Sequence, residues 1–300
     1  MASPLPIPGR RFVIGVPYVW LFVFFFLPFL ILLYISFVDM GTDIHPFKPI
    51  WDSTTGLLKL KYENYFSIFR TEEGAPLFHT LYVDAYLRSI GYALLTAIFC
   101  LVLGYPFAYF LARSPASVRP ALLLMVMLPF WTSFLLRVYA WKGILADNGV
   151  LNRFFMSLGL TSEPIQMLYT NVSMLVGMTY VYLPFMVLPL YANLVKMDFR
   201  LLEAAYDLGT TPFKAFWLIT VPLSKAGIIA GFMLVFIPCV GEFVIPSLLG
   251  GPENYMIGRV VWDEMFTAND WPKATALAVV MIAVIVVPLG IYYHYTSEDQ

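Results

Sequence analysis

Long apolar runs that are nearly free of charged residues are the feature that most constrains how this chain can fold. A helix needs about 20 such residues to cross the hydrocarbon core of a bilayer. Six runs of this kind follow one another, at about 12–38, 90–112, 120–140, 167–195, 226–249 and 274–294. The first is too long for the core of a signal peptide and lacks a small-residue cleavage site, so we expect it to be retained. The sequence therefore predicts an all-α membrane protein, with one transmembrane domain over residues 1–300.

The composition fits lipid rather than water as the solvent. Hydrophobic residues make up 60% of the chain and charged residues 12%, whereas a soluble protein carries about a quarter charged residues. The net charge of −1 comes without a basic cluster, so nothing indicates nucleic-acid binding. Cys100 and Cys239 lie in apolar runs, and the chain has neither a CxxC motif nor a His-rich tract. We therefore expect no metal or redox site.

The charges of the connecting segments predict which side of the membrane each segment faces. Six spans place both termini on the same side. The segments 1–11, 113–119, 196–225 and 294–300 carry eight Lys and Arg residues against five Asp and Glu residues. Positive residues in short loops mark the cytoplasmic side. We therefore expect both termini in the cytoplasm and an external loop at 39–86, which contains strand-like and turn-like pieces.

The segment between the fourth and fifth spans, residues 198–222, has the signals of two short helices. Asp198 is a suitable N-cap, and Gly209 is the residue type that ends a helix with a positive φ. Thr211 can cap a second helix that has Pro212 in its first turn. The sequence therefore predicts two short cytoplasmic helices joined at a glycine, and we call residues 198–222 the coupling segment.

The coupling segment resembles the EAA loop of ABC importer permeases, in which Glu-Ala-Ala is followed by a glycine and then by Ile-x-Leu-Pro. The matching residues are Glu203, Ala204, Ala205, Gly209, Ile219 and Pro222. Val221 stands where the family pattern has leucine. The resemblance implies a coupling helix that sits in a cleft of an ATPase subunit. The alternative is an amphipathic helix resting on the bilayer surface.

Longer stretches resemble the bacterial spermidine/putrescine permeases, and among them the first of two permease subunits. These stretches are residues 128–141, 148–152, 182–189 and 238–251. The resemblance covers most of the chain and implies six transmembrane helices of the type I ABC importer permease fold in a bacterial inner membrane. It also implies a second homologous permease, a homodimer of ATPase subunits and a periplasmic polyamine-binding protein. Importers for iron, sulfate, thiamine and phosphonates share the coupling loop, so that loop alone does not name the substrate.

The chain has no ATP-binding motif of its own. No GxxxxGK[ST] loop occurs in the sequence, and no catalytic pattern such as HExxH lies in the spans. We therefore expect a non-enzymatic subunit without a cofactor, with ATP and Mg bound by the partner ATPase. An ion-coupled secondary transporter would share the spans, but it would not need the coupling segment and would more often show repeated halves.

Glu242, a carboxylate inside the fifth predicted span, is the main candidate for the substrate path. A charge at that depth costs about 2.5–3.5 kcal/mol on insertion scales unless it faces water or a partner. Glu242 therefore meets a cationic substrate, pairs with Arg137 in the third span, or lies nearer the outer interface than the span suggests. Aromatic rings can hold an amine over their faces, although Trp and Tyr also form belts at membrane interfaces. The aromatic candidates are Trp131, Tyr139, Trp141, Tyr180 and Tyr182.

Overall fold

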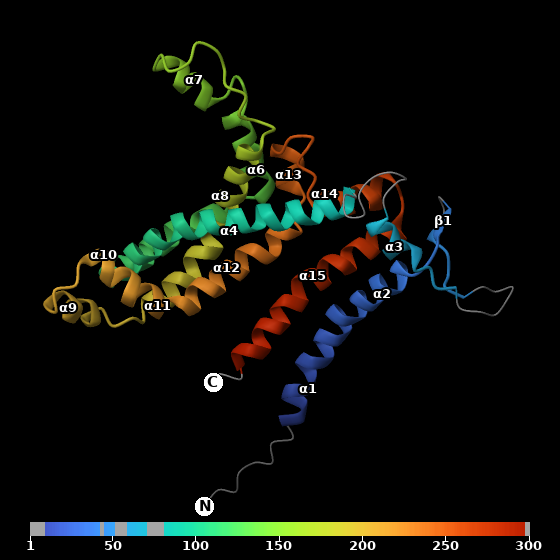
Figure 1. The fold of residues 1–300 in the computed structure, drawn as a ribbon, viewed down its shortest axis with the longest axis horizontal. Helices are drawn as coiled ribbons and strands as arrows, with labels where there is room; N and C mark the ends of the chain where they lie inside the picture. Colours follow the sequence, from blue (N-terminus) through green and yellow to red (C-terminus); the bar gives the residue numbers. More distant parts are fainter. Residues whose placement is uncertain (1–9, 43–44, 52–58, 71–80, 298–300) are drawn as a thin grey trace, which may run out of the picture. The chain divides into compact units, whose positions relative to one another are not determined.

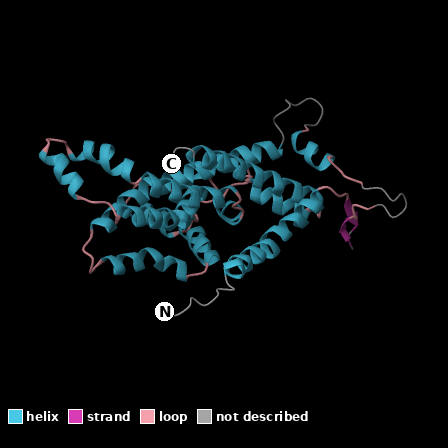
Figure 2. Ribbon diagram, turned by 90° about the horizontal axis from the view of Figure 1, so that it is seen from below, coloured by secondary structure: helices cyan, strands magenta, loops and turns pink. Residues whose placement is uncertain are grey.

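The structure, a computed structural model, describes residues 10–42, 45–51, 59–70 and 81–297. Helices dominate these residues, as Figure 2 shows. The loop predicted at 39–86 contributes a hairpin in which β1 (Met40–Thr42) pairs antiparallel with β2 (His45–Phe47). The chain divides into two compact units, one of Met1–Val83 with Val260–Gln300 and one of Asp84–Arg259.

The first unit contains the N-terminal span and the last helix (Figure 1). Its further elements are α1 (Arg10–Leu21), η1 (Phe22–Phe26), α2 (Leu27–Ser36), α3 (Glu63–Phe69), η4 (Asp263–Thr267) and α15 (Trp271–Ser297). α15 packs against α2 and α3. The side-chain amide of Asn64 donates to the carbonyls of Ser36 at 2.9 Å and Val38 at 3.0 Å. These bonds fix α3 to the end of the first span.

The second unit is built around α8 and α12, which pack along each other. Its elements, counting two that cross its boundary, are α4 (Leu81–Arg113), α5 (Arg119–Met127), η2 (Leu128–Trp131), α6 (Phe134–Leu145), α7 (Val150–Ser157), α8 (Asn171–Leu194), α9 (Arg200–Asp207), α10 (Pro212–Ala215), η3 (Phe216–Thr220), α11 (Val221–Leu223), α12 (Lys225–Val240), α13 (Val244–Leu249) and α14 (Ile257–Trp262). Glycines allow the close contact: a Cβ on Gly231 would lie 2.8 Å from Met186 Sδ, and one on Gly227 would lie 2.7 Å from Asn193 Cβ. Small residues at such contacts are typical of helix packing in membranes.

All six apolar runs of the sequence fall on helices. In the described residues, three continuous helices are long and apolar enough to cross a membrane: Val13–Ser36, Leu81–Arg113 and Asn171–Leu194. Two bent helix pairs bring the number to five if each pair counts as one span. α15 carries a shorter apolar stretch, Trp271–Val287, at the place of the sixth predicted span. α4 (Leu81–Arg113), the helix that carries the second predicted span, begins ahead of residue 90.

The third predicted span is bent rather than straight. The segments Arg119–Trp131 and Phe134–Ser157 meet at an angle of 87°. Pro129 lies in η2 and cannot donate a backbone hydrogen bond, and Thr132 and Ser133 then adopt extended backbone angles. The hydropathy of residues 120–140 therefore predicted an apolar segment but not the bend within it.

The fifth predicted span also differs from a single helix over 226–249. α12 ends at Val240, and a short break at residues 241–243 separates it from α13. Pro246 lies in the first turn of α13, a position that proline tolerates because the backbone N–H there has no helical partner. Glu242 therefore lies in a break between two helices and not inside one.

Candidate functional site

The first helix of the coupling segment ends as the sequence predicts. Gly209 has a φ of +80°, and its N–H donates to the carbonyl of Tyr206 at 2.9 Å. The N–H of Thr210 donates to the carbonyl of Ala205 at 3.0 Å. These two bonds form a Schellman motif, in which the residue after the helix takes the left-handed conformation that glycine adopts without strain. The predicted turn at Gly209 is confirmed.

The second helix begins as predicted. Thr211 Oγ1 accepts a hydrogen bond from the N–H of Lys214 at 3.4 Å, and Pro212 is the first residue of α10. The chain continues through η3 into α11, and at Ser224 the segment Pro212–Leu223 meets Lys225–Val240 at 69°. Ala215 and Thr220 are buried, so this half of the segment packs against the rest of the second unit.

The start of α9 differs slightly from the prediction that Asp198 is its N-cap. Phe199 occupies that position and its side chain makes no cap bond. Asp198 nevertheless accepts the backbone N–H of Arg200 at 3.1 Å and its guanidinium at 3.0 Å. The hydrogen bonds from Arg200 hold the pKa of the Asp198 carboxyl below its ordinary value. Asp198 therefore accepts a backbone N–H from the first turn of α9, although it lies one residue before the N-cap position.

The coupling segment leaves an apolar face open. Glu203 and Ala204 are exposed, Ala205 is half-buried, and Leu208 beside them is 86% exposed. Nearer the end of the segment, Ile219 is half-buried and Pro222 is exposed. Figure 1 shows α9 and α10 beyond the ends of α8 and α12, opposite the end that carries α13. A leucine exposed beside small alanines suits contact with another protein.

Glu242 lies in the break between α12 and α13 and is buried, with 9% of its surface exposed. Its Oε1 accepts hydrogen bonds from the N–H groups of Val244 at 3.0 Å and Ile245 at 3.3 Å. Its Oε2 accepts the hydroxyl of Tyr182 on α8 at 2.6 Å. The carboxylate therefore caps the first turn of α13, where a negative charge is favourable.

Arg137 is not the partner of Glu242 that the sequence suggested. Its guanidinium lies over the ring of Phe130 at 5.3 Å, and its Nε and Nη1 are buried without a hydrogen-bond partner among the described residues. A row of rings connects the two charged groups: Phe130 lies 5.2 Å from Phe185, and Phe185 lies 6.1 Å from Tyr182. Glu242 and Arg137 therefore lie at opposite ends of an aromatic row.

Of the predicted aromatic candidates, the structure brings Tyr182 to Glu242. Trp131 is 72% exposed and Tyr139 is also exposed. Tyr180 contacts Trp141, with ring centroids 5.5 Å apart. Among the hydrogen bonds and ring contacts of the described residues, none joins Trp131, Tyr139 or Tyr180 to Glu242.

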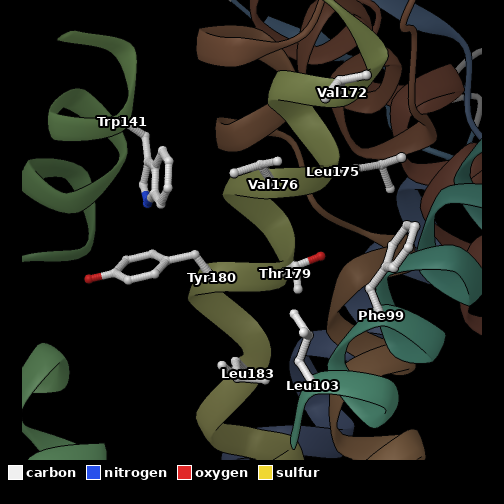
Figure 3. Close-up of a pocket in the computed structure, with 9 residues that line it drawn as sticks. All are labelled: Phe99, Leu103, Trp141, Val172, Leu175, Val176, Thr179, Tyr180 and Leu183. Carbon is white, nitrogen blue, oxygen red and sulfur yellow. The ribbon is translucent and has the colours of Figure 1, made fainter. Parts of the chain in front are cut away.

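Tyr180 and Trp141 instead border an apolar cavity of about 420 Å³. Figure 3 shows these two rings on one side of α8, with Phe99 and Leu103 of α4 on the other. The polar atoms that Figure 3 marks in the lining are the hydroxyl oxygens of Thr179 and Tyr180 and the indole nitrogen of Trp141. A cavity with this lining suits an apolar occupant better than a charged amine.

Sequence reasoning missed Phe130 and Phe185. Their signal was present, since Phe130 follows Pro129 and Phe185 follows Pro184 within stretches already singled out. The contact between these two rings depends on how η2 packs against α8, and the periodicity within one helix does not predict that packing.

Comparison with known proteins identifies the relatives of this chain. The family model for the binding-protein-dependent transport system inner membrane component matches residues 104–297. The spermidine/putrescine transport system permease protein PotB of Escherichia coli is 38% identical over 274 residues, which cover 91% of this chain and 93% of that protein. PotB of Haemophilus influenzae is 34% identical, covering 95% and 93% of the two chains.

Solved structures show the same fold at low sequence identity. The bacterial ABC transporter that imports alginate has a chain with a TM-score of 0.67 and 16% identity, covering 96% of each chain. A chain of the MetNI methionine ABC transporter has a TM-score of 0.51 and 14% identity, covering 73% of this chain and 95% of that one. The likeness to the alginate transporter chain extends over nearly the whole of this chain.

Proposed function

Given that this chain belongs to the family of binding-protein-dependent transport system inner membrane components, we propose that it is one permease of an ATP-driven importer of polyamines. The observation that carries the proposal is the identity of 34–38% to spermidine/putrescine permeases over more than nine-tenths of the chain. The fold supports the same class, because the related structures are chains of ABC importers. The membrane is the inner membrane of a bacterium, with both termini in the cytoplasm.

The coupling segment is the proposed contact with an ATPase. Its support is an exposed apolar face around Ala204 and Leu208, held in shape by the Schellman motif at Gly209. ATP and Mg are bound by the ATPase subunits, a homodimer, and this chain contributes no catalytic residue. The effect of hydrolysis reaches the spans through α12, since this helix follows the coupling segment directly.

Two further partners complete the importer. A second, homologous permease shares the path, and a periplasmic polyamine-binding protein delivers the substrate. A complex of an alginate importer with its substrate-bound periplasmic protein provides a structural precedent for delivery in this fold. The binding protein applies the first selection among substrates.

Glu242 is the proposed contact for a protonated amine in the path. Its carboxylate has three donors within the chain and no basic partner among the described residues, so its negative charge is hydrogen-bonded but not neutralised. The ring of Tyr182 lies beside it, with the ring of Phe185 next to Tyr182, and aromatic rings can face an ammonium group. A cationic substrate that reaches this break would meet both.

The test is reconstitution of the whole importer, with its binding protein, in lipid vesicles. We expect ATP hydrolysis and uptake to rise with putrescine or spermidine, and to stay at the basal rate with sulfate, thiamine or a phosphonate. Stimulation by one of those solutes and not by a polyamine would show that the chain is a permease of a related importer with a different substrate. Uptake that follows an ion gradient without any ATPase would reject the ABC importer class.

A further inference from the structure

We propose that a groove between α4 and the coupling segment binds one anionic phospholipid, with an acyl chain in the groove and the phosphate on Arg113. The groove has a volume of about 420 Å³. Val102, Tyr105 and Tyr109 of α4 form one wall, and Phe216, Trp217 and Ile228 lie opposite. This volume is within the range of small-molecule sites, about 300–1,000 Å³, and too small for a further helix.

The groove lies where a lipid can enter it. Residues 89–112 of α4 carry no charge, and Arg113 is the last residue of that helix. A basic residue that ends an apolar span of this length lies at the level of the lipid headgroups, whichever way the chain is oriented. Val102 is 62% exposed, so the groove is open toward the bilayer in the middle of the span.

Arg113 is held beside the end of the groove and has no counter-ion there. Its Nη1 donates to the hydroxyl of Tyr109 at 3.4 Å, and its guanidinium lies 5.6 Å from the Tyr109 ring and 5.8 Å from the Phe199 ring. In the described part of the chain it forms no ion pair. The two rings fix the guanidinium in place while leaving its charge for an anion, and a phosphate accepts two of its donors at once.

The start of α12 is fixed to the wall of the groove, because Ser224 Oγ and Tyr105 Oη are 2.7 Å apart. Lys225 follows Ser224, is exposed, and precedes Ile228 by one turn on the same helix face. Arg113 beside Tyr109 gives an apolar groove a positive charge at one end, the pattern that an anionic phospholipid complements. Because Phe216 and Trp217 belong to the coupling segment, the bound lipid would also brace that segment.

The experiment measures the lipid retained by the assembled complex. The complex is equilibrated with mixed micelles of phosphatidylcholine and phosphatidylglycerol, affinity-purified, and analysed for bound phospholipid by mass spectrometry. We expect the wild type to retain phosphatidylglycerol in excess over its share in the mixture. Arg113→Gln should lower that excess about fivefold, the preference that one basic residue adds near an anionic surface. Arg113→Lys should keep most of it.

Two further variants separate the groove from the general lipid shell. Val102→Trp fills the groove without changing any charge, and it should reduce the retained phosphatidylglycerol as Arg113→Gln does. Arg153→Gln removes an exposed arginine of α7 and should leave retention at the wild-type level. Neither readout needs a polyamine or ATP, so failure here is distinct from failure of the proposed function.

Three outcomes would overturn the lipid site. The wild-type complex could retain phosphatidylglycerol only in the proportion of the lipid mixture, as expected for unspecific boundary lipid. Arg113→Gln could retain as much as Arg113→Lys. A cysteine at Val102 could cross-link efficiently to the second permease, which would make the groove a protein interface.

Discussion

The hydroxyl of Tyr182 donates to Glu242 Oε2 at 2.6 Å, joining the middle of α8 to the break that follows α12. The other carboxylate oxygen accepts two backbone amides of α13. Donors alone surround this carboxylate within the described residues. Glu242 can therefore hold the break in shape and still attract a cation.

Glu242→Gln should reduce polyamine uptake without preventing assembly. The amide keeps an oxygen for the N–H groups of Val244 and Ile245, while the charge is lost. A charge contact to an amine is worth about 1–3 kcal/mol, which corresponds to a tenfold to hundredfold loss of uptake. The measurement is uptake of labelled polyamine per assembled complex in vesicles.

The amount of assembled complex distinguishes a role of Glu242 in transport from a purely structural role. If Glu242 serves mainly as the cap of α13, the variant should assemble poorly and each surviving complex should transport normally. Loss of a cap costs about 0.5–2 kcal/mol. That result would remove Glu242 from the proposed path.

Tyr182→Phe tests whether the hydrogen bond positions the carboxylate. Removing a bond to a charged group costs about 1.5–3 kcal/mol, so we expect lower thermal stability together with reduced uptake per complex. Tyr139→Phe is the matched control, because Tyr139 is exposed and has no hydrogen bond among the described residues. It should change stability by less than about 0.5 kcal/mol. Equal behaviour of the two variants would show that the Tyr182–Glu242 bond has no role in the path.

Much of the fold could be predicted from sequence, because the bilayer imposes a length and an apolar composition on each span. The ends of the coupling helices were also predictable, since Gly209 and Thr211 with Pro212 act through their own backbone and near neighbours. The bend at Thr132–Ser133 was not, because apolar residues precede and follow it alike.

The partner of Glu242 could not be predicted for a related reason. The charge of Arg137 made it the obvious candidate, but the choice between Arg137 and Tyr182 depends on how α8 packs on α12 and where α12 ends. That packing brings together side chains that are far apart in sequence, and the residues near each of them in sequence do not predict the contact. The exposure of Leu208 beside Ala204 and Ala205 was likewise not predicted and appears only in the structure.

Gly209→Val should lower both transport and polyamine-stimulated ATP hydrolysis while leaving membrane insertion intact. A β-branched residue at a φ of +80° is strained by roughly 1–3 kcal/mol, and the Schellman turn between the two helices should shift. Polyamine-stimulated hydrolysis and uptake should fall together. Gly159→Val is the matched control, because Gly159 also has a positive φ, +70°, and open space around it, but lies outside the coupling segment. Similar losses in both variants would point to general destabilisation instead.

Leu208→Asp tests the docking face directly. Leu208 is 86% exposed, so the substitution should not change the stability of the isolated chain by more than about 0.5 kcal/mol. A charge placed in an apolar contact should weaken binding of the ATPase by on the order of tenfold or more. Co-purification of the ATPase measures this, with Leu160→Asp, an exposed leucine outside the segment, as the control. Full retention of the ATPase by Leu208→Asp would place its contact elsewhere.

The orientation of the chain can be tested with two exposed arginines. Arg70 lies in the external loop and Arg200 in the coupling segment, with side chains 75% and 85% exposed. Each forms an exposed ion pair, with Glu63 and Asp198 respectively, and such pairs contribute about 0–1 kcal/mol, so replacement by cysteine should be tolerated at both positions. The native Cys100 and Cys239 are buried and should give little background. In intact cells, a membrane-impermeant thiol reagent should label Arg70→Cys and spare Arg200→Cys until the membrane is permeabilised. The reverse pattern would contradict the proposed orientation, because the coupling segment would then face away from any cytoplasmic ATPase. It would also show that the charges of the loops predicted the wrong side of the membrane.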